Sequence, residues 1–180
     1  MKNFVMSRVY PMLAVSGICF LLISSCKKSN NDPAPENPLL TATVQMSGAN
    51  ETPPITTTGT GTAKITYDKD KRTISYDLSW HLGDEASLTT GMHFHGAEDG
   101  SDLKNSPVVV PINGFTSASS GTLTGTTREL TPAEAAQLLA GKWYINIHSS
   151  VNPGGEIRGN IKLTSNTSAT STGGGNTPGY

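Results

Sequence analysis

Apolar and polar residues alternate with a period of two through most of this chain, and this alternation constrains the fold more than any other feature. Ile74, Tyr76, Leu78 and Trp80 are apolar, and the residues between them are small or charged. Successive side chains of a β-strand point to opposite faces of a sheet, so the pattern predicts strands that bury one face. Similar alternation or a short apolar run recurs at residues 40–46, 63–67, 92–94, 108–112, 143–147 and 157–163.

Turn signals separate these segments, and one helix interrupts them. The polar stretch Asp68-Lys69-Asp70-Lys71 joins two alternating segments and predicts a hairpin. The sequence TPAE at residues 131–134 has the form of a capping box with Pro at the first helical position, and Gly141 ends the helix. We therefore expect an all-β domain, an antiparallel, Greek-key-like β-sandwich of about eight strands with one short helix.

The N-terminal segment has the form of a bacterial lipoprotein signal. Lys2 and Arg8 precede an apolar stretch at residues 12–23, which is shorter than the roughly 20 apolar residues of a membrane-spanning helix. The stretch runs into LISSC at residues 22–26, which resembles a lipobox, whose Cys receives the lipid. The alternative is an ordinary secretory signal that happens to have a Cys at its end. We expect Cys26 to be the lipid anchor.

Cysteine content and charge exclude several kinds of function. The chain has 2 cysteines, of which Cys19 lies in the expected signal and Cys26 at its end. A mature domain without a thiol is no disulfide scaffold, Cys-ligated metal site or cysteine hydrolase. The formal net charge is −1 and the Lys and Arg residues are not clustered, so no nucleic-acid partner is expected.

The sequence divides into four parts. We assign residues 1–25 to the signal peptide, 26–38 to a disordered polar tether, 39–163 to the β domain and 164–180 to a disordered tail. Lys27 and Lys28 occupy the positions where an Asp would favour retention in the inner membrane. We therefore expect a protein anchored by lipid in the bacterial cell envelope, at the outer membrane, with a protein or envelope partner that the sequence does not identify.

Three histidines are candidate metal ligands. His93 and His95 flank Phe94 in one predicted strand, and side chains two residues apart share a face with a spacing of about 7 Å. His148 ends the strand at residues 143–147, whose odd-numbered residues face the core. All three imidazoles are therefore expected on polar faces. Three neutral imidazoles with an open position form a copper or zinc site.

The same histidines also fit a structural role. Imidazoles at these positions can hydrogen-bond the backbone of the loops at residues 96–106 and 149–155. His81 lies where a strand passes into a loop, and we assign it to the surface without a function. Arg158 points away from the face of Ile157 and is expected to face outward near the end of the domain.

No enzyme motif accompanies these residues, since the chain lacks G-x-S-x-G, a P-loop and H-E-x-x-H. We expect a lipid-anchored module, without evident catalysis, that binds other proteins or envelope components. The alternative is a mononuclear copper or zinc site built from His93, His95 and His148, with a redox or metal-carrying function. Copper and zinc are the cofactors that the sequence suggests.

Four motifs, in this order, resemble the chordin-type (CHRD) domain. They are SGANETPPI at residues 47–55, MHFHGA at 92–97, GTLTG at 121–125, and YINIHS with NPGGEIRG at 144–149 and 152–159. The resemblance spans nearly all of residues 40–163. In chordin the domain belongs to an extracellular binding protein, so the resemblance implies a β-sandwich module rather than a reaction.

A more distant likeness is to copper/zinc superoxide dismutases, which also combine an H-x-H strand, a later strand ending in His and a Gly-rich turn leading to Arg. This likeness implies that His93, His95 and His148 are copper ligands and that Arg158 guides the substrate anion. The residues between His95 and the next predicted strand contain no His. The bridging His and the zinc-binding loop of those enzymes therefore have no counterpart, and the likeness favours a simplified metal site over a dismutase.

The lipobox generates the first testable prediction. Replacing Cys26 with Ser removes the thiol that would receive the lipid, so metabolic labelling with a radioactive fatty acid should be lost. The variant should appear as soluble protein or as unprocessed precursor in membrane fractionation. Normal processing with full membrane retention of Cys26→Ser would contradict the assignment.

Overall fold

The computed structural model describes residues 37–97, 99 and 104–165. Cys26, the signal peptide, most of the tether and residues 166–180 lie outside this part of the chain. The described strands are β1 (Leu39–Ser47), β2 (Thr60–Asp68), β3 (Thr73–His81), β4 (Thr89–His95), β5 (Val108–Pro111), β6 (Ser120–Thr126), β7 (Tyr144–Ser149), β8 (Ile157–Asn160) and β9 (Thr164–Ser165). A short 3₁₀ helix (Gly48–Asn50) follows β1, and the α-helix α1 (Pro132–Leu139) precedes β7.

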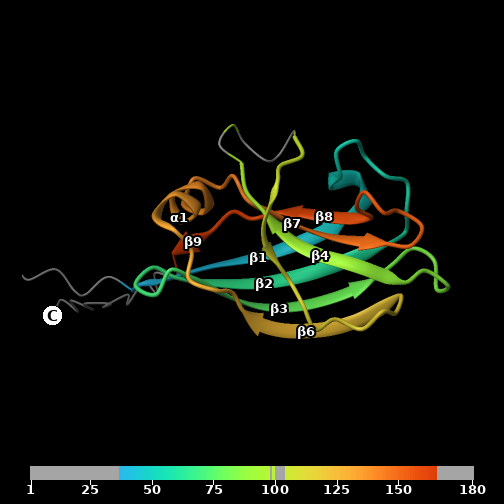
Figure 1. Cartoon of the computed structure of the whole chain (residues 1–180), viewed down its shortest axis with the longest axis horizontal. Coiled ribbons are helices and arrows are strands. Elements are labelled where there is room, and N and C mark those ends of the chain that lie inside the picture. The colour runs from blue at the N-terminus through green and yellow to red at the C-terminus, as the bar shows by residue number, and fades with distance from the viewer. Residues whose placement is uncertain (1–36, 98, 100–103, 166–180) are drawn as a thin grey trace, which may run out of the picture. The chain divides into compact units, whose positions relative to one another are not determined.

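The strands form one antiparallel sheet in the order β5-β4-β7-β8-β1-β2-β3-β6, with β9 paired to β1 beside this path. β1 and β2 pair along their whole length, as do β2 and β3. In contrast, β8 meets β1 at a single pair, Ser47 and Arg158. The sheet therefore consists of two four-stranded halves joined at one corner, as the ribbon in Figure 1 shows.

The two halves face each other across the core, which makes the sheet a curled β-sandwich (Figure 1). The ring centroids of Tyr76 on β3 and Phe94 on β4 lie 5.7 Å apart, and Trp80 Nε1 donates to Thr89 Oγ1 at 2.9 Å. The predicted all-β class and antiparallel sandwich are confirmed. The halves are connected by backbone hydrogen bonds at the corner, because β8 continues from the β4–β7 half onto β1.

The hydrophobic core lies between the halves. Nearly every strand contributes the side chains of its apolar face to it. β7 shows how the period of two builds it, since Ile145 and Ile147 are fully buried in this core together with Trp143 just before the strand. The prediction that the odd-numbered residues of this strand face the core is therefore correct. The other buried core residues are Val44, Met46, Ala63, Ile65, Tyr67, Ile74, Leu78, Trp80, Leu82, Met92, Phe94, Val110, Ile112, Leu130, Ala135, Leu138, Ile157 and Ile161.

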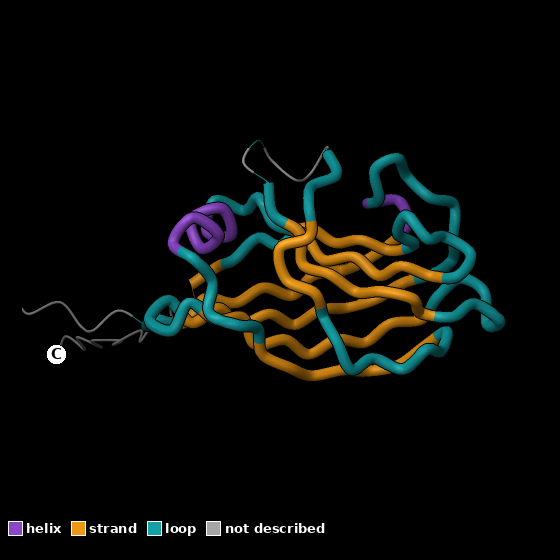
Figure 2. The backbone as a smooth tube through the Cα atoms, in the orientation of Figure 1, coloured by secondary structure: helices purple, strands orange, loops and turns teal. Residues whose placement is uncertain are grey.

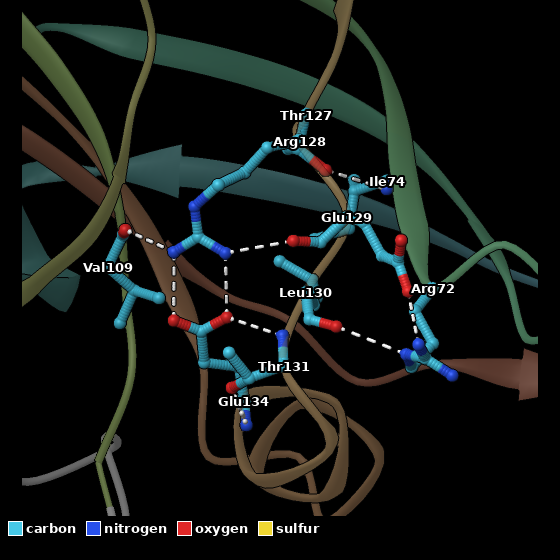
Figure 3. Close-up of polar contacts among 9 residues, drawn as sticks. All are labelled: Arg72, Ile74, Val109, Thr127, Arg128, Glu129, Leu130, Thr131 and Glu134. Atoms are coloured by element: carbon cyan, nitrogen blue, oxygen red, sulfur yellow. Dashed lines mark hydrogen bonds and ion pairs between the residues drawn. The ribbon is translucent and has the colours of Figure 1, made fainter.

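Helix α1 closes one end of the sandwich and has the predicted capping box. Thr131 Oγ1 accepts from the Glu134 backbone N–H, and the Glu134 carboxylate accepts from the Thr131 N–H. Figure 3 shows Arg128 reaching the same carboxylate with both terminal nitrogens, at 2.8 Å each, and the Val109 carbonyl at 3.1 Å. Arg128 therefore links the segment after β6 to both β5 and α1, and it lowers the pKa of Glu134 to about 2.

The ends of the described domain are set by pairing with β1. The strand begins at Leu39, where the β domain was expected to start. At the other end Thr164 and Ser165 pair with β1, and the Thr164 hydroxyl donates to the Thr41 carbonyl. Residues 164 and 165 were assigned to the tail because they bury nothing; backbone pairing orders them instead. Among the described residues, no helix has the length and apolarity needed to cross a membrane.

The core assignment of β7 yields a stability prediction. Ile145→Ala removes a fully buried side chain and leaves a cavity, so the free energy of unfolding should fall by about 2 to 5 kcal/mol in urea denaturation. Thr124→Ala, on the exposed face of β6, is the control and should change it by less than about 0.5 kcal/mol. Equal effects of the two substitutions would show that this face of β7 is not the core.

Candidate metal centre

The three candidate histidines lie on the outer face of the sheet, where β4 and β7 pair. His93 lies opposite Asn146, and Gly91 lies opposite His148. The next outward residue of β4, His95, lies opposite Tyr144. None of the three imidazoles belongs to the hydrophobic core. The prediction that they lie on the polar faces of their strands is therefore correct.

Folding brings the three imidazoles together. One nitrogen from each of His93, His95 and His148 lies within 4.8 Å of the other two. The ring of His93 lies between the others, with its centroid 5.6 Å from that of His95 and 5.0 Å from that of His148. Two ligands of a tetrahedral ion with metal–nitrogen bonds of 2.0–2.1 Å are about 3.4 Å apart, so small side-chain rotations would close the cluster around an ion.

Two of the imidazoles are held by the loops that were expected to contact them. His95 Nδ1 lies 2.8 Å from the Ser106 carbonyl oxygen, and His148 Nδ1 lies 2.8 Å from that of Pro153. Because a carbonyl oxygen only accepts, each Nδ1 carries a proton, and Nε2 of a neutral His148 ring keeps its lone pair. His95 Nε2 faces a second acceptor, Asn146 Oδ1, at 3.0 Å. His95 and His148 therefore hold the loops, and they also converge with His93 on one point.

Two nitrogens of the cluster are buried without a hydrogen-bond partner among the described residues, His93 Nδ1 and His148 Nε2. Buried polar atoms are usually paired, so each unpaired one requires an explanation. Burial lowers the pKa of His93, and the neighbouring His148 and His95 add to this effect. Burial also lowers the pKa of His95 against the opposing effect of its hydrogen bonds. Both rings are therefore neutral at neutral pH, as metal ligation requires.

Gly91 provides the space for this cluster on β4. A Cβ atom at this position would lie 3.1 Å from His93 Cε1 and 3.6 Å from His148 Cδ2. The first distance is tighter than an ordinary van der Waals contact. A side chain at residue 91 would therefore press on the ring of His93 and would lie in ordinary contact with the ring of His148.

Arg158 points away from the core as predicted but does not reach solvent. Its exposed fraction is 0%, and its guanidinium carbon lies 3.5 Å from the centroid of the Tyr144 ring. Its terminal nitrogens donate to Asn105 Oδ1 and the Lys104 carbonyl, both at 3.2 Å. Loop residues therefore cover the side chain and bind its donors, and the anion-guiding role expected of Arg158 stays a prediction.

Two residues that the sequence analysis did not single out complete the site, Glu51 and Asn146. Asn146 is 3% exposed, and its Oδ1 lies 3.0 Å from His95 Nε2. Its amide also hydrogen-bonds the Glu51 carboxyl, which is 6% exposed and whose Oε1 has no partner among the described residues. Burial raises the pKa of Glu51 to about 7, against the lowering effects of Arg158, Asn146 and the Thr52 backbone.

Loops cover this polar layer. The 3₁₀ helix after β1 contacts β8, since Asn50 Nδ2 donates to the Arg158 carbonyl at 3.0 Å. The loop after β7 passes over Glu51 at Gly155, whose φ of +129° suits glycine and where a Cβ would lie 2.5 Å from Glu51 Oε1. Figure 2 shows the loop after β1 and the described ends of the β4–β5 loop on the same side of the molecule. Asn105 Nδ2 joins them by donating to the Thr52 carbonyl.

Fold and site together define the class of this protein, a small all-β module that carries a polar, histidine-rich site on the outer face of one sheet half. The CHRD domain family matches residues 42–161, and the chain belongs to this family. The resemblance seen in the four motifs is thereby confirmed. No curated protein and no solved structure is significantly similar to the chain.

Glu51 gives the site a measurable pH dependence. With its pKa raised from 4.5 to about 7, the folded protein holds this proton to higher pH than the unfolded chain does. The resulting contribution to stability is complete below about pH 4.5 and is lost as the pH rises through 7. Relative to Glu51→Gln, which cannot ionise, the wild type should therefore lose stability between pH 4.5 and pH 8.

Urea denaturation of both proteins across this range measures the effect. The control is Glu85→Gln, since Glu85 is exposed and should leave the pH profile of the wild type unchanged. Parallel profiles for the wild type and Glu51→Gln would contradict the raised pKa.

Proposed function

We propose that this CHRD module is a metal-binding protein that holds one copper(II) or zinc(II) ion at His93, His95 and His148. The observation that carries the proposal is the convergence of three imidazole nitrogens to within 4.8 Å on strands far apart in sequence. Imidazole is a ligand that suits both zinc and copper. Three protein ligands leave a coordination position for water or for a further ligand.

The hydrogen bonds around the histidines support this proposal. Metal-binding histidines usually donate their other ring N–H to a carbonyl or carboxylate, which fixes the tautomer and the ring orientation. The carbonyls of Ser106 and Pro153 provide this for His95 and His148. An ion bound to His148 Nε2 would also give a partner to a nitrogen that otherwise has none among the described residues.

The covered Arg158 restricts the kind of metal protein that this chain can be. A dismutase-like site uses an accessible cation to attract its anionic substrate, and Arg158 is buried against Tyr144 and the loop. We therefore favour binding or carrying of the ion over turnover of a small anion. As a second part of the proposal, Cys26 anchors the module by lipid at the outer membrane, so that the ion is held in the envelope; the signal-like residues 12–26 support this part.

Isothermal titration of the chain from residue 27 onward, which lacks the signal peptide and Cys26, with zinc(II) and with copper(II) tests the proposed function. One ion should bind per chain, and binding should weaken as the pH falls below about 6.5, where protons compete for imidazole. His93→Ala should lose this binding and keep its circular dichroism spectrum, because His93 lies off the core.

His81→Ala is the matched control, since His81 is an exposed histidine at the end of β3. It should bind the ion as the wild type does. Equal, weak binding by the wild type and by His93→Ala would show that the cluster is only a structural element that holds the loops.

A further inference from the structure

Asn146 presents an oxygen atom to the three-histidine cluster. It lies directly opposite His93 on β4, and it shares the outward face of β7 with His148 two residues later. Its Oδ1 lies 3.0 Å from His95 Nε2, and the residue is 3% exposed. A buried amide oxygen therefore lies beside the imidazoles that would bind an ion.

Glu51 determines which atom of the Asn146 amide points to the histidines. A Cβ atom built on Gly155 would lie 2.9 Å from Asn146 Nδ2 and 2.5 Å from Glu51 Oε1, so the amide nitrogen lies on the side of this carboxyl. The Glu51 carboxyl hydrogen-bonds the amide, whose nitrogen only donates. Glu51 therefore keeps Nδ2 turned away from the histidines, and Oδ1 turned toward them.

His95 has more acceptors around it than a neutral ring can satisfy. The Ser106 carbonyl oxygen lies 2.8 Å from Nδ1, and Asn146 Oδ1 lies 3.0 Å from Nε2. A neutral imidazole carries one N–H, so whichever nitrogen has the proton, the other turns its lone pair toward an oxygen. A metal ion bound to both Nε2 and Oδ1 removes this repulsion, because Nδ1 then donates to Ser106 and the ion lies between the other two atoms.

The distance between these two atoms fits a shared ion. Ligands with bonds of about 2.0–2.1 Å lie about 2.9 Å apart at a right angle and about 3.4 Å apart at the tetrahedral angle. The 3.0 Å between Asn146 Oδ1 and His95 Nε2 lies between these values. The three imidazole nitrogens lie within 4.8 Å of one another. Asn146 and His95 are therefore already spaced as neighbouring ligands.

We propose that Asn146 Oδ1 is the fourth ligand of the metal centre and completes a shell of three imidazole nitrogens and one amide oxygen. This inference rests on the proposed metal-binding function and deepens it. A tetrahedral site with four protein ligands has no open position for water or substrate, as is typical of sites that hold an ion without catalysing a reaction. Glu51 is then a positioning residue, since it holds the amide nitrogen.

Zinc(II) affinity of the chain from residue 27 onward, measured against a competing chelator, tests the fourth ligand. Asn146→Ala removes the oxygen and should bind zinc at least about ten-fold more weakly than the wild type, since even the loss of an outer-shell partner costs about this much. Asn146→Asp keeps an oxygen at this position and adds negative charge, so it should bind zinc at least as tightly as the wild type. Asn160→Ala is the control, because Asn160 Oδ1 accepts from Arg158 Nε at 3.4 Å, and the affinity should not change.

Cobalt(II) in place of zinc gives a second readout, which the wild type alone can provide. With four protein ligands, the visible absorption spectrum of the cobalt-loaded wild type should not change when azide is added. In Asn146→Ala water would take the vacant position, so azide should change the spectrum.

Two sets of results would overturn the fourth ligand. A wild-type cobalt spectrum that responds to azide as that of Asn146→Ala does, or an Asn146→Ala affinity for zinc equal to or above that of the wild type, overturns it alone. An absence of zinc binding by the wild type, or binding that His93→Ala retains in full, overturns the proposed function and this inference with it.

Discussion

The pairing of β7 with β4 on one side and with β8 on the other is the constraint on which the site depends. In this register His93, Asn146 and Arg158 lie in one row across three strands, and all of them point away from the core. Slipping a strand by one residue would turn its outward side chains into the core. Burial of Ile145 and Ile147 on the opposite face opposes such a slip. The hydrophobic core of β7 therefore also fixes the arrangement of the polar residues that could bind an ion.

The outer face of this sheet half is unusual because it is covered. An antiparallel sheet commonly packs one face on the core and exposes the other to water, yet Tyr144 and Asn146 are 2% and 3% exposed. Buried polar groups need partners, and most of those here have them: Arg158 stacks on Tyr144, and Asn146 contacts both Glu51 and His95. The exceptions are Glu51 Oε1 and the unpaired nitrogens of the histidine cluster. Under the proposed metal binding, an ion in the histidine cluster would give a partner to His148 Nε2.

Much of this structure could be predicted from the alternation of apolar and polar residues and from short sequence motifs. Alternation identified the core face of β7, the capping box identified the start of α1, and the H-x-H spacing identified two imidazoles on one face. The burial of Arg158 and the roles of Glu51 and Asn146 could not be predicted in this way. The alternation of apolar and polar residues indicates to which face of the sheet a side chain points. Whether an outward side chain is also buried depends on loops from distant parts of the chain. The motif containing Glu51, SGANETPPI, offered the one signal, since a polar stretch rich in turn residues marks a loop with a defined conformation.

The sequence leaves open whether the histidines hold loops or bind a metal, and the geometry shows that the first role prepares the second. A neutral imidazole has one donor and one acceptor nitrogen, and the loop carbonyls of Ser106 and Pro153 select Nδ1 as the donor in His95 and His148. This selection leaves Nε2 of a neutral His148 ring as a lone pair held in a fixed direction. If the rings did not hold the loops, they could rotate and change tautomer, and an ion would have to order them at an entropic cost. If the proposed ion binds, the bonds that attach the loops to the sheet are therefore the same bonds that orient the rings of His95 and His148 for it.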